Sequence, residues 1–113
     1  IIERYISPVN LFVFVIPEYN GGFPGVLKSF IDVVPPAEFH HKKAGLIGIS
    51  SGHSGSLRAM DQFTNVLNYL KVNVYHFKPK FSKIEEMLDA EGKFISPEPL
   101  ELLRTHIAGL RDM

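Results

Sequence analysis

The stretch Leu11-Phe12-Val13-Phe14-Val15-Ile16 decides the fold class of this chain. It joins aliphatic, β-branched and aromatic residues in a run that is too short for a typical buried helix and is closed by Pro17. Continuous apolar runs of this kind are typical of strands that are buried on both faces of a parallel sheet. A second short apolar run covers residues 44–49. A third strand is predicted from Val72, Val74, Tyr75 and Phe77.

Helical periodicity fills the segments between these runs. Pro24 suits the first turn of a helix whose apolar positions continue to Val34, and the pair Pro35-Pro36 ends it. Apolar residues then recur at three- and four-residue steps from Leu57 to Leu70. Strands that alternate with helices predict an α/β fold, in which helices cover both faces of a parallel sheet.

The last third of the chain is less regular. A short helix is predicted around Ser82–Leu88, and a final helix carries an apolar stripe that ends at Leu110. Ser96 is expected to cap the final helix and Pro97 to open it.

Composition excludes several functional classes. The chain has 113 residues, with 12 Lys and Arg against 12 Asp and Glu, and it contains no cysteine. The length allows one domain. A net charge of zero argues against nucleic acid or an anionic membrane as a partner. The absence of cysteine excludes thiolate catalysis, disulfides and iron–sulfur clusters, and no metal site is predicted. No apolar run approaches the length of a membrane span and no signal peptide is visible, so the expected location is the cytoplasm.

Two glycine-rich loops follow the first two predicted strands, where ligands bind in parallel sheets. The loop Ser50–Ser56 has three interpretations. It could be a nest of backbone amides beside a helix N-terminus, a plain connector, or a serine nucleophile, because Gly48-Ile49-Ser50-Ser51-Gly52 matches the G-x-S-x-G pattern. The nucleophile is the weakest of the three, since the helical period begins only near Leu57 and no histidine stands at a characteristic spacing.

The loop Pro17–Gly22 combines an aromatic ring, Tyr19, with an amide, Asn20, and two glycines. Glycines let a flat ligand approach the backbone closely. Glu18 could act as an acid or base, or be solvated. The sequence therefore indicates either a ligand loop or a polar turn.

Two longer blocks carry a resemblance to a known family. Residues 17–32, Pro-Glu-Tyr-Asn-Gly-Gly-Phe-Pro-Gly-Val-Leu-Lys-Ser-Phe-Ile-Asp, resemble the signature of the NADPH-dependent FMN reductase family. That family is flavodoxin-like and includes quinone, chromate and azo-dye reductases. Residues 50–62 are similar to its second flavin loop and the helix that follows. The family usually has glycine where this chain has Ser56.

The resemblance implies a flavodoxin-like three-layer α/β/α fold with a parallel sheet ordered 2-1-3-4-5. Residues 1–113 would be the C-terminal part of a single FMN-binding domain and would cover its third to fifth strands and their helices. Two βα units with the phosphate-binding loop, on the order of 60 residues, would precede Ile1, and Ile1–Ser7 would be the tail of the second helix.

The resemblance also implies the activity: FMN passes a hydride from NAD(P)H to a small acceptor such as a quinone, an azo compound or free flavin. No side chain is then catalytic, because the flavin performs the chemistry. The family associates as dimers or tetramers, which makes Phe23 and the helix from Pro24 candidate contacts. The implied cofactor-binding residues are Pro17, Glu18, Tyr19, Asn20, Gly21, Ser50, Ser51, Gly52, His53 and Gly55.

Two other functions stay open at this stage. A flavodoxin-like electron carrier or interaction module without catalysis would share the fold, although a neutral charge disfavours a carrier. A serine hydrolase using Ser50 would be labelled by a fluorophosphonate and would bind no flavin.

Overall fold

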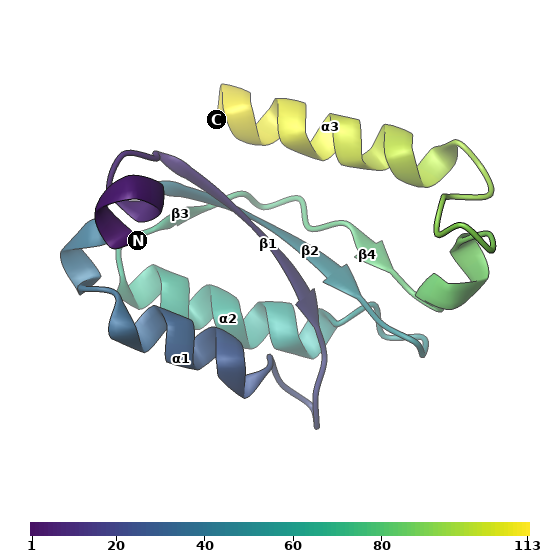
Figure 1. Ribbon diagram of the computed structural model, residues 1–113, viewed down its shortest axis with the longest axis horizontal. Coiled ribbons are helices and arrows are strands. Elements are labelled where there is room, and N and C mark those ends of the chain that lie inside the picture. Colours follow the sequence, from purple (N-terminus) through teal and green to yellow (C-terminus); the bar gives the residue numbers. More distant parts are fainter.

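A parallel sheet forms the middle layer of the fold in the computed structural model, which describes residues 1–113 (Figure 1). Helices α1 (Gly25–Val33) and α2 (Leu57–Tyr69) cover one face of the sheet. Helix α3 (Glu98–Asp112) covers the other face. The three layers confirm the predicted α/β class.

The strands run parallel and follow one another across the sheet. Strand β1 (Leu11–Pro17) pairs along its whole length with β2 (Lys43–Ile49), so that Pro17 lies opposite Ile49. The short strands β3 (Asn73–Val74) and β4 (Lys80–Phe81) both pair with the other edge of β2. Three consecutive strands of a βα-alternating chain therefore become neighbours, as the resemblance implies for the third to fifth strands.

The predicted third strand is interrupted. Val74 of β3 lies opposite Ala44, and Lys80 of β4 lies opposite Gly48. The chain therefore advances six residues from Val74 to Lys80 while β2 advances only four from Ala44 to Gly48. The two extra residues bulge out at residues 76–78, whereas the Tyr75 amide still donates to the Ala44 carbonyl and the Pro79 carbonyl still accepts from the Gly48 amide. The prediction that Phe77 belongs to a continuous strand is wrong: its ring lies 5.9 Å from the His106 ring, against α3.

Burial of β1 also differs from the prediction. Phe14 packs against α2, with its ring 4.9 Å from the Phe63 ring. On the opposite face Val13 and Val15 keep 40% and 57% of their surface exposed, because α3 lies over β2 and leaves β1 uncovered. Strand β1 is therefore buried on one face only, and its outer edge has no partner strand.

The α2 face of the sheet holds the core. Phe63 is fully buried at its centre and contacts the Phe14 and Phe23 rings. Because Phe23 lies just before α1, this contact fixes the start of α1 against α2. The buried core residues are Ile6, Ile16, Ile31, Val34, Phe39, Ala44, Leu46, Ala59, Met60, Phe63, Leu67, Leu70 and Val72.

Three single-turn helices complete the chain: a π-helix at Ile2–Ile6 and 3-10 helices at Pro36–Glu38 and Ile84–Met87. The last one lies within the predicted helix 82–88. Ser96 does not cap α3, because Pro97 occupies the N-cap position without a side-chain cap.

The Ser96 hydroxyl lies near the side chain of Glu98 instead. The backbone of Glu98 and this hydroxyl hold the pKa of the Glu98 carboxyl below its usual range. The longest helix, α3, has 15 residues, and no helix reaches the length and hydropathy that a membrane crossing requires.

Candidate functional site: two loops at one edge of the sheet

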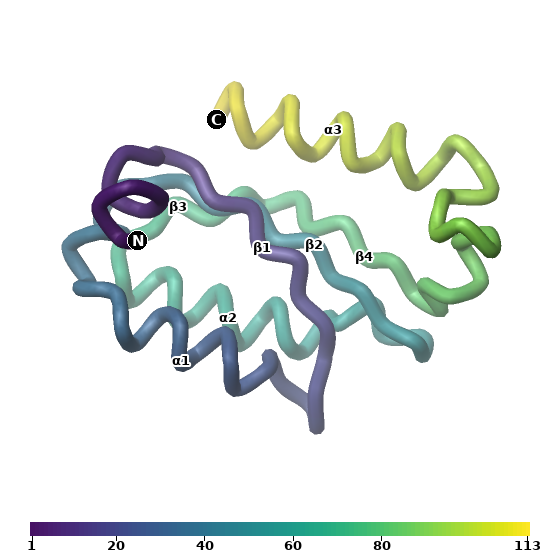
Figure 2. Tube along the Cα trace, in the orientation of Figure 1, coloured from purple at the N-terminus to yellow at the C-terminus, as the bar shows by residue number.

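The two predicted loops leave the sheet side by side. Strands β1 and β2 are parallel and end in register at Pro17 and Ile49, so the loops that follow them start at the same edge. Figure 2 shows the chain turning out of both strands at this end. We call residues 17–22 the first loop and residues 50–56 the second loop.

The first loop ends in a tight turn. Tyr19 and Gly22 exchange two backbone hydrogen bonds, of 2.8 Å and 3.1 Å, across Asn20 and Gly21. Asn20 and Gly21 both have positive φ, 52° and 83°, which is the geometry of a type I′ turn and explains the Asn-Gly pair. The amides of Asn20 and Gly21 donate to no protein acceptor, so they are available to a ligand.

The second loop is organised by the Ser50 hydroxyl. Its Oγ donates to the Gly52 carbonyl at 2.8 Å and accepts from the Gly55 amide at 2.9 Å. Gly55 has a φ of 62°, a conformation that favours glycine. The four consecutive amides of residues 51–54 have no protein acceptor. Two sets of free N–H groups therefore lie at one edge of the sheet, the arrangement that suits an electron-rich ligand.

Residues beyond β4 support the second loop from behind. The amides of Lys83 and Ile84 donate to the carbonyls of Gly52 and Ser50, both at 2.9 Å. The Ser82 hydroxyl donates to the His53 carbonyl at 2.7 Å. These bonds hold the carbonyl groups of the loop toward the protein, which leaves its amides free.

An acidic residue that sequence reasoning missed also reaches the second loop. Glu85 accepts a hydrogen bond of 2.6 Å from the Ser51 hydroxyl. This bond, together with the backbone of Glu85, holds the pKa of the Glu85 carboxyl below its usual range. Residues 44–60 contain no Asp or Glu, but the fold brings Glu85 from a later segment to the second loop. No sequence pattern predicts this contact.

Glu18 has the most unusual environment in the first loop. Its side chain is only 16% exposed, and Oε2 lies 3.8 Å from the Arg58 guanidinium at the start of α2. The other oxygen, Oε1, is buried and has no hydrogen-bond partner. Arg58 follows the second loop in the sequence, but its guanidinium lies beside Glu18 of the first loop.

The remaining predicted residues line the two loops in simpler ways. Pro17 ends β1 and is half-buried. Tyr19 is 60% exposed, so its ring is free to contact a ligand, and His53 is exposed on the second loop.

Ser56 differs from the glycine that the family usually has. It takes a left-handed φ of 67° and is fully buried, and its Oγ has no hydrogen-bond partner. Both the conformation and the unpaired hydroxyl cost stability at this position.

The geometry does not support a serine nucleophile. The Ser50 hydroxyl donates to a backbone carbonyl, and no histidine is bonded to it. Helix α2 begins only at Leu57, so Ser50 is not at a strand-to-helix elbow.

The donor set fits a flavin ring. A planar heteroaromatic ring presents carbonyl and ring-nitrogen acceptors along its edge, and the free amides of residues 20–21 and 51–54 would meet such acceptors. No three His, Asp or Glu side chains gather where a metal ion could be held.

Comparison with known proteins gives the class of the chain. The sequence profile described as "NADPH-dependent FMN reductase" matches residues 2–82. The chain belongs to this family. It is 31% identical over 118 residues to the NAD(P)H-dependent FMN reductase PA1204 of Pseudomonas aeruginosa, a match that covers 97% of this chain and 63% of PA1204. It is 40% identical over 74 residues to the NAD(P)H-dependent FMN reductase LOT6 of Saccharomyces cerevisiae, covering 64% of this chain and 36% of LOT6.

A third relative and one solved structure extend the comparison. The 2-hydroxy-1,4-benzoquinone reductase of a Burkholderia species is 28% identical, with 91% of this chain and 59% of that protein covered. The flavoenzyme FerB, an NAD(P)H:(acceptor) oxidoreductase from Paracoccus denitrificans, has the same fold, with a TM-score of 0.77 at 23% identity, over 94% of this chain and 62% of FerB. The chain spans less than two thirds of the length of these proteins.

Proposed function

We propose that the protein containing this chain is a flavin-dependent oxidoreductase that uses FMN to pass a hydride from NAD(P)H to a small acceptor such as a quinone, an azo compound or free flavin. The observation that carries the proposal is the pair of loops with free amides at one edge of the sheet. The names of the relatives, reductases of FMN and of a benzoquinone, support the same chemistry.

The residues that would hold FMN are those of the two loops. Bound FMN supplies the hydride chemistry, and the protein supplies position and electrostatic field. Backbone groups of Pro17, Glu18, Tyr19, Asn20 and Gly21 would line one side of the ring, and the exposed Tyr19 ring would border the acceptor site. Ser50, Ser51, Gly52, His53 and Gly55 would hold the pyrimidine end. Free N–H groups there stabilise the negative charge that reduction adds to the ring.

The absorption spectrum of the complete protein, purified without added cofactor, tests this proposal. A flavin spectrum, together with NAD(P)H oxidation that depends on a quinone, is the expected result. A colourless protein that does not take up FMN would contradict it. A flavin-loaded protein without NAD(P)H oxidation would instead support the electron-carrier alternative.

Replacing Gly52 by aspartate is expected to weaken FMN binding about tenfold, or about 1.4 kcal/mol, and to lower the reduction potential of the bound flavin. A Cβ at Gly52 meets no atom within 4 Å, so the new side chain fits and acts through its charge. The matched control is Gly52→Asn, which has the same shape without the charge. FMN titration and redox titration of both variants check the prediction, and equal values for the two would contradict it.

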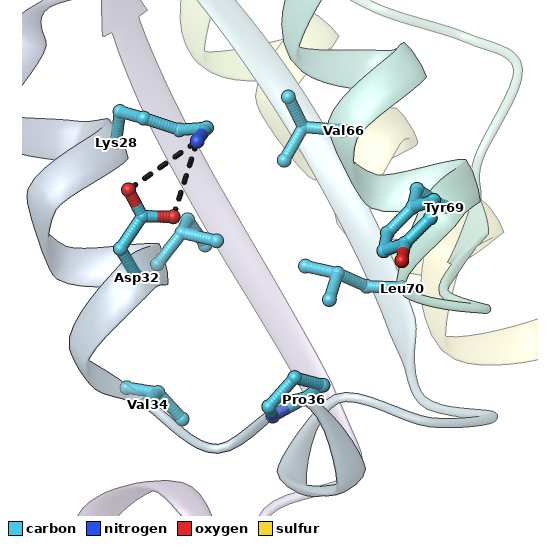
Figure 3. Close-up of a pocket in the computed structure, with 8 residues that line it drawn as sticks. Lys28, Asp32, Val34, Pro36, Val66, Tyr69 and Leu70 are labelled. Atoms are coloured by element: carbon cyan, nitrogen blue, oxygen red, sulfur yellow. Dashed lines mark hydrogen bonds and ion pairs between the residues drawn. The ribbon is translucent and has the colours of Figure 1, made fainter.

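We also propose that the protein is a homodimer, or a tetramer built from such dimers, that forms through the α1–α2 face. A cavity of about 350 Å³ lies between these helices, with Ile31, Val34 and Pro36 on one side and Val66, Tyr69 and Leu70 on the other (Figure 3). The Lys28–Asp32 ion pair, 3.1 Å long, lies at its edge. Tyr69, which lines the cavity, is 85% exposed, and Val33 at the end of α1 is 72% exposed, which suits an interface. Phe23 contributes less to the proposed dimer contact than the resemblance implies, because its ring packs against Phe63 within the chain.

Two substitutions test the dimer. Val33→Glu and Tyr69→Glu are expected to shift the protein toward monomer in sedimentation velocity, because each buries a charge in an apolar contact. Ala90→Glu, at an exposed turn that follows Ile84–Met87, is the control for the added charge. Unchanged sedimentation in both α1–α2 variants would contradict this interface.

Residues 1–113 are proposed to be the C-terminal part of one flavodoxin-like domain. The unpaired outer edge of β1 and the exposed Val13 and Val15 support this, since a further strand and a helix would complete the sheet there. The greater length of the relatives agrees. We propose the cytoplasm as its location, since NAD(P)H, the proposed donor, is available there.

A further inference from the structure

We propose that Arg58 and Gln62 of α2 are positioning residues that hold the first loop in place, and that Arg58 also offsets the charge of Glu18 beside the flavin. This inference rests on the proposed function. It concerns two side chains that belong to neither loop. Both side chains connect the first loop to α2, the helix that follows the second loop.

Gln62 and Arg58 lie one helical turn apart on α2, and both reach toward the first loop. The Gln62 amide donates to the Gly21 carbonyl at 3.3 Å. Its other atom, Oε1, packs so closely on Gly22 that a Cβ there would lie 2.6 Å away. A side chain at position 22 would therefore displace the Gln62 amide from its place beside the turn.

The Asn20 and Gly21 carbonyls of the turn accept no backbone amide, and Gln62 supplies a donor to the Gly21 carbonyl. The peptide unit of this carbonyl carries the Gly22 amide, which donates to the Tyr19 carbonyl. The Gln62 bond therefore fixes the turn that presents the free amides of Asn20 and Gly21. The same helix begins at the second loop. Helix α2 thus joins the two loops as one rigid support.

Arg58 acts through charge. Glu18 is largely buried, and one of its carboxylate oxygens has no hydrogen-bond partner, so the 3.8 Å approach of the Arg58 guanidinium is its only ion pair. An uncompensated carboxylate beside a flavin disfavours the negative charge that reduction adds to the ring. Arg58 therefore favours reduction by offsetting Glu18, although it need not touch the flavin.

The experiment measures FMN affinity and reduction potential in the complete protein. Gln62→Glu places a carboxylate against the Gly21 carbonyl, and the dissociation constant for FMN is expected to rise about tenfold. Asn65→Asp adds the same charge to an exposed position of α2, and its dissociation constant for FMN is expected to stay within about twofold of the wild-type value. Equal affinities in the two variants would overturn the role of Gln62.

Arg58→Met is expected to lower the reduction potential of bound FMN, and adding Glu18→Gln to this variant is expected to restore it. A merely structural role of Arg58 would not be rescued by neutralising Glu18. Arg104→Met on α3, which removes an exposed arginine far from the loops, controls for net charge. An Arg58→Met potential equal to wild type, or one that Glu18→Gln fails to restore, would overturn the charge role.

The wild-type protein separates this inference from the proposed function. If it takes up no FMN, the proposed function fails and the inference fails with it. If it takes up FMN and the variants match wild type, only the inference fails.

Discussion

Replacing Gly48 by alanine is expected to cost about 1–3 kcal/mol of stability and to weaken FMN binding at least tenfold. Gly48 lies on β2 under the second loop. A Cβ at this position would overlap the Gly55 carbonyl oxygen and would lie 2.7 Å from the Met60 methyl group. Met60 can move, but the Gly55 carbonyl is backbone, so the loop itself has to shift. Both measurements should change together, because one displacement causes both.

The control for Gly48→Ala is Gly25→Ala. A Cβ at Gly25 meets no atom within 4 Å, and the residue begins a helix. Urea unfolding and FMN fluorescence titration of both variants check the prediction. A Gly48→Ala protein with wild-type stability and affinity would show that the second loop tolerates movement away from β2, which would contradict the role given to its backbone.

Replacing His106 by leucine is expected to raise the free energy of unfolding by about 1 kcal/mol at pH 7.5 and to weaken its dependence on acid. His106 is fully buried where α3 meets β2, and neither ring nitrogen has a hydrogen-bond partner. Its ring packs beside Tyr75 and Phe77, and Nε2 would lie 2.6 Å from a Cβ at Gly45. An apolar side chain removes two unpaired polar atoms from this contact.

The sign of the pH effect follows from burial. Desolvation lowers the pKa of the His106 imidazole, and the nearby Phe77 backbone, which does not reach hydrogen-bond geometry, opposes this shift more weakly. The unfolded chain therefore takes up the proton first as pH falls. The contribution of neutral His106 to the free energy of unfolding is fully present above the ordinary histidine pKa, near 6.5. This contribution is lost as pH falls from there toward the lower pKa of His106 in the folded protein.

Urea titrations between pH 7.5 and 5 test this prediction. The His106→Leu protein should lose less stability over this range than wild type, whereas His76→Gln, which changes an exposed histidine, should keep the wild-type slope. A steeper acid dependence in His106→Leu would contradict the prediction.

The strands and helices of the first two thirds were predictable because they depend on local patterns. The short continuous apolar run of β1 and the periodic apolar stripe of α2 identify these two elements without tertiary information. The break at residues 76–78 was not predictable, since there Phe77 packs against His106, which lies 29 residues further along the chain on α3. Neither was the exposed face of β1, which reflects where α3 lies.

The position of the candidate site was predictable, but its electrostatics were not. Loops that follow parallel strands share an edge, so residues 17–22 and 50–56 had to meet. Their contacts with FMN remain a prediction. The contacts of Glu85 with Ser51 and of Arg58 with Glu18 could not be predicted from the sequence, because each joins side chains 34 or more residues apart in the chain. His106 was not singled out either, since its burial depends on three elements packing together.

The sequence by itself determined the α/β class, the two loops and the family, because strand and helix periods and the order of short motifs are properties of neighbouring residues. Only the tertiary structure decided which charge faces which loop and which amides stay free. These features depend on distances between segments far apart in the chain, and packing sets those distances.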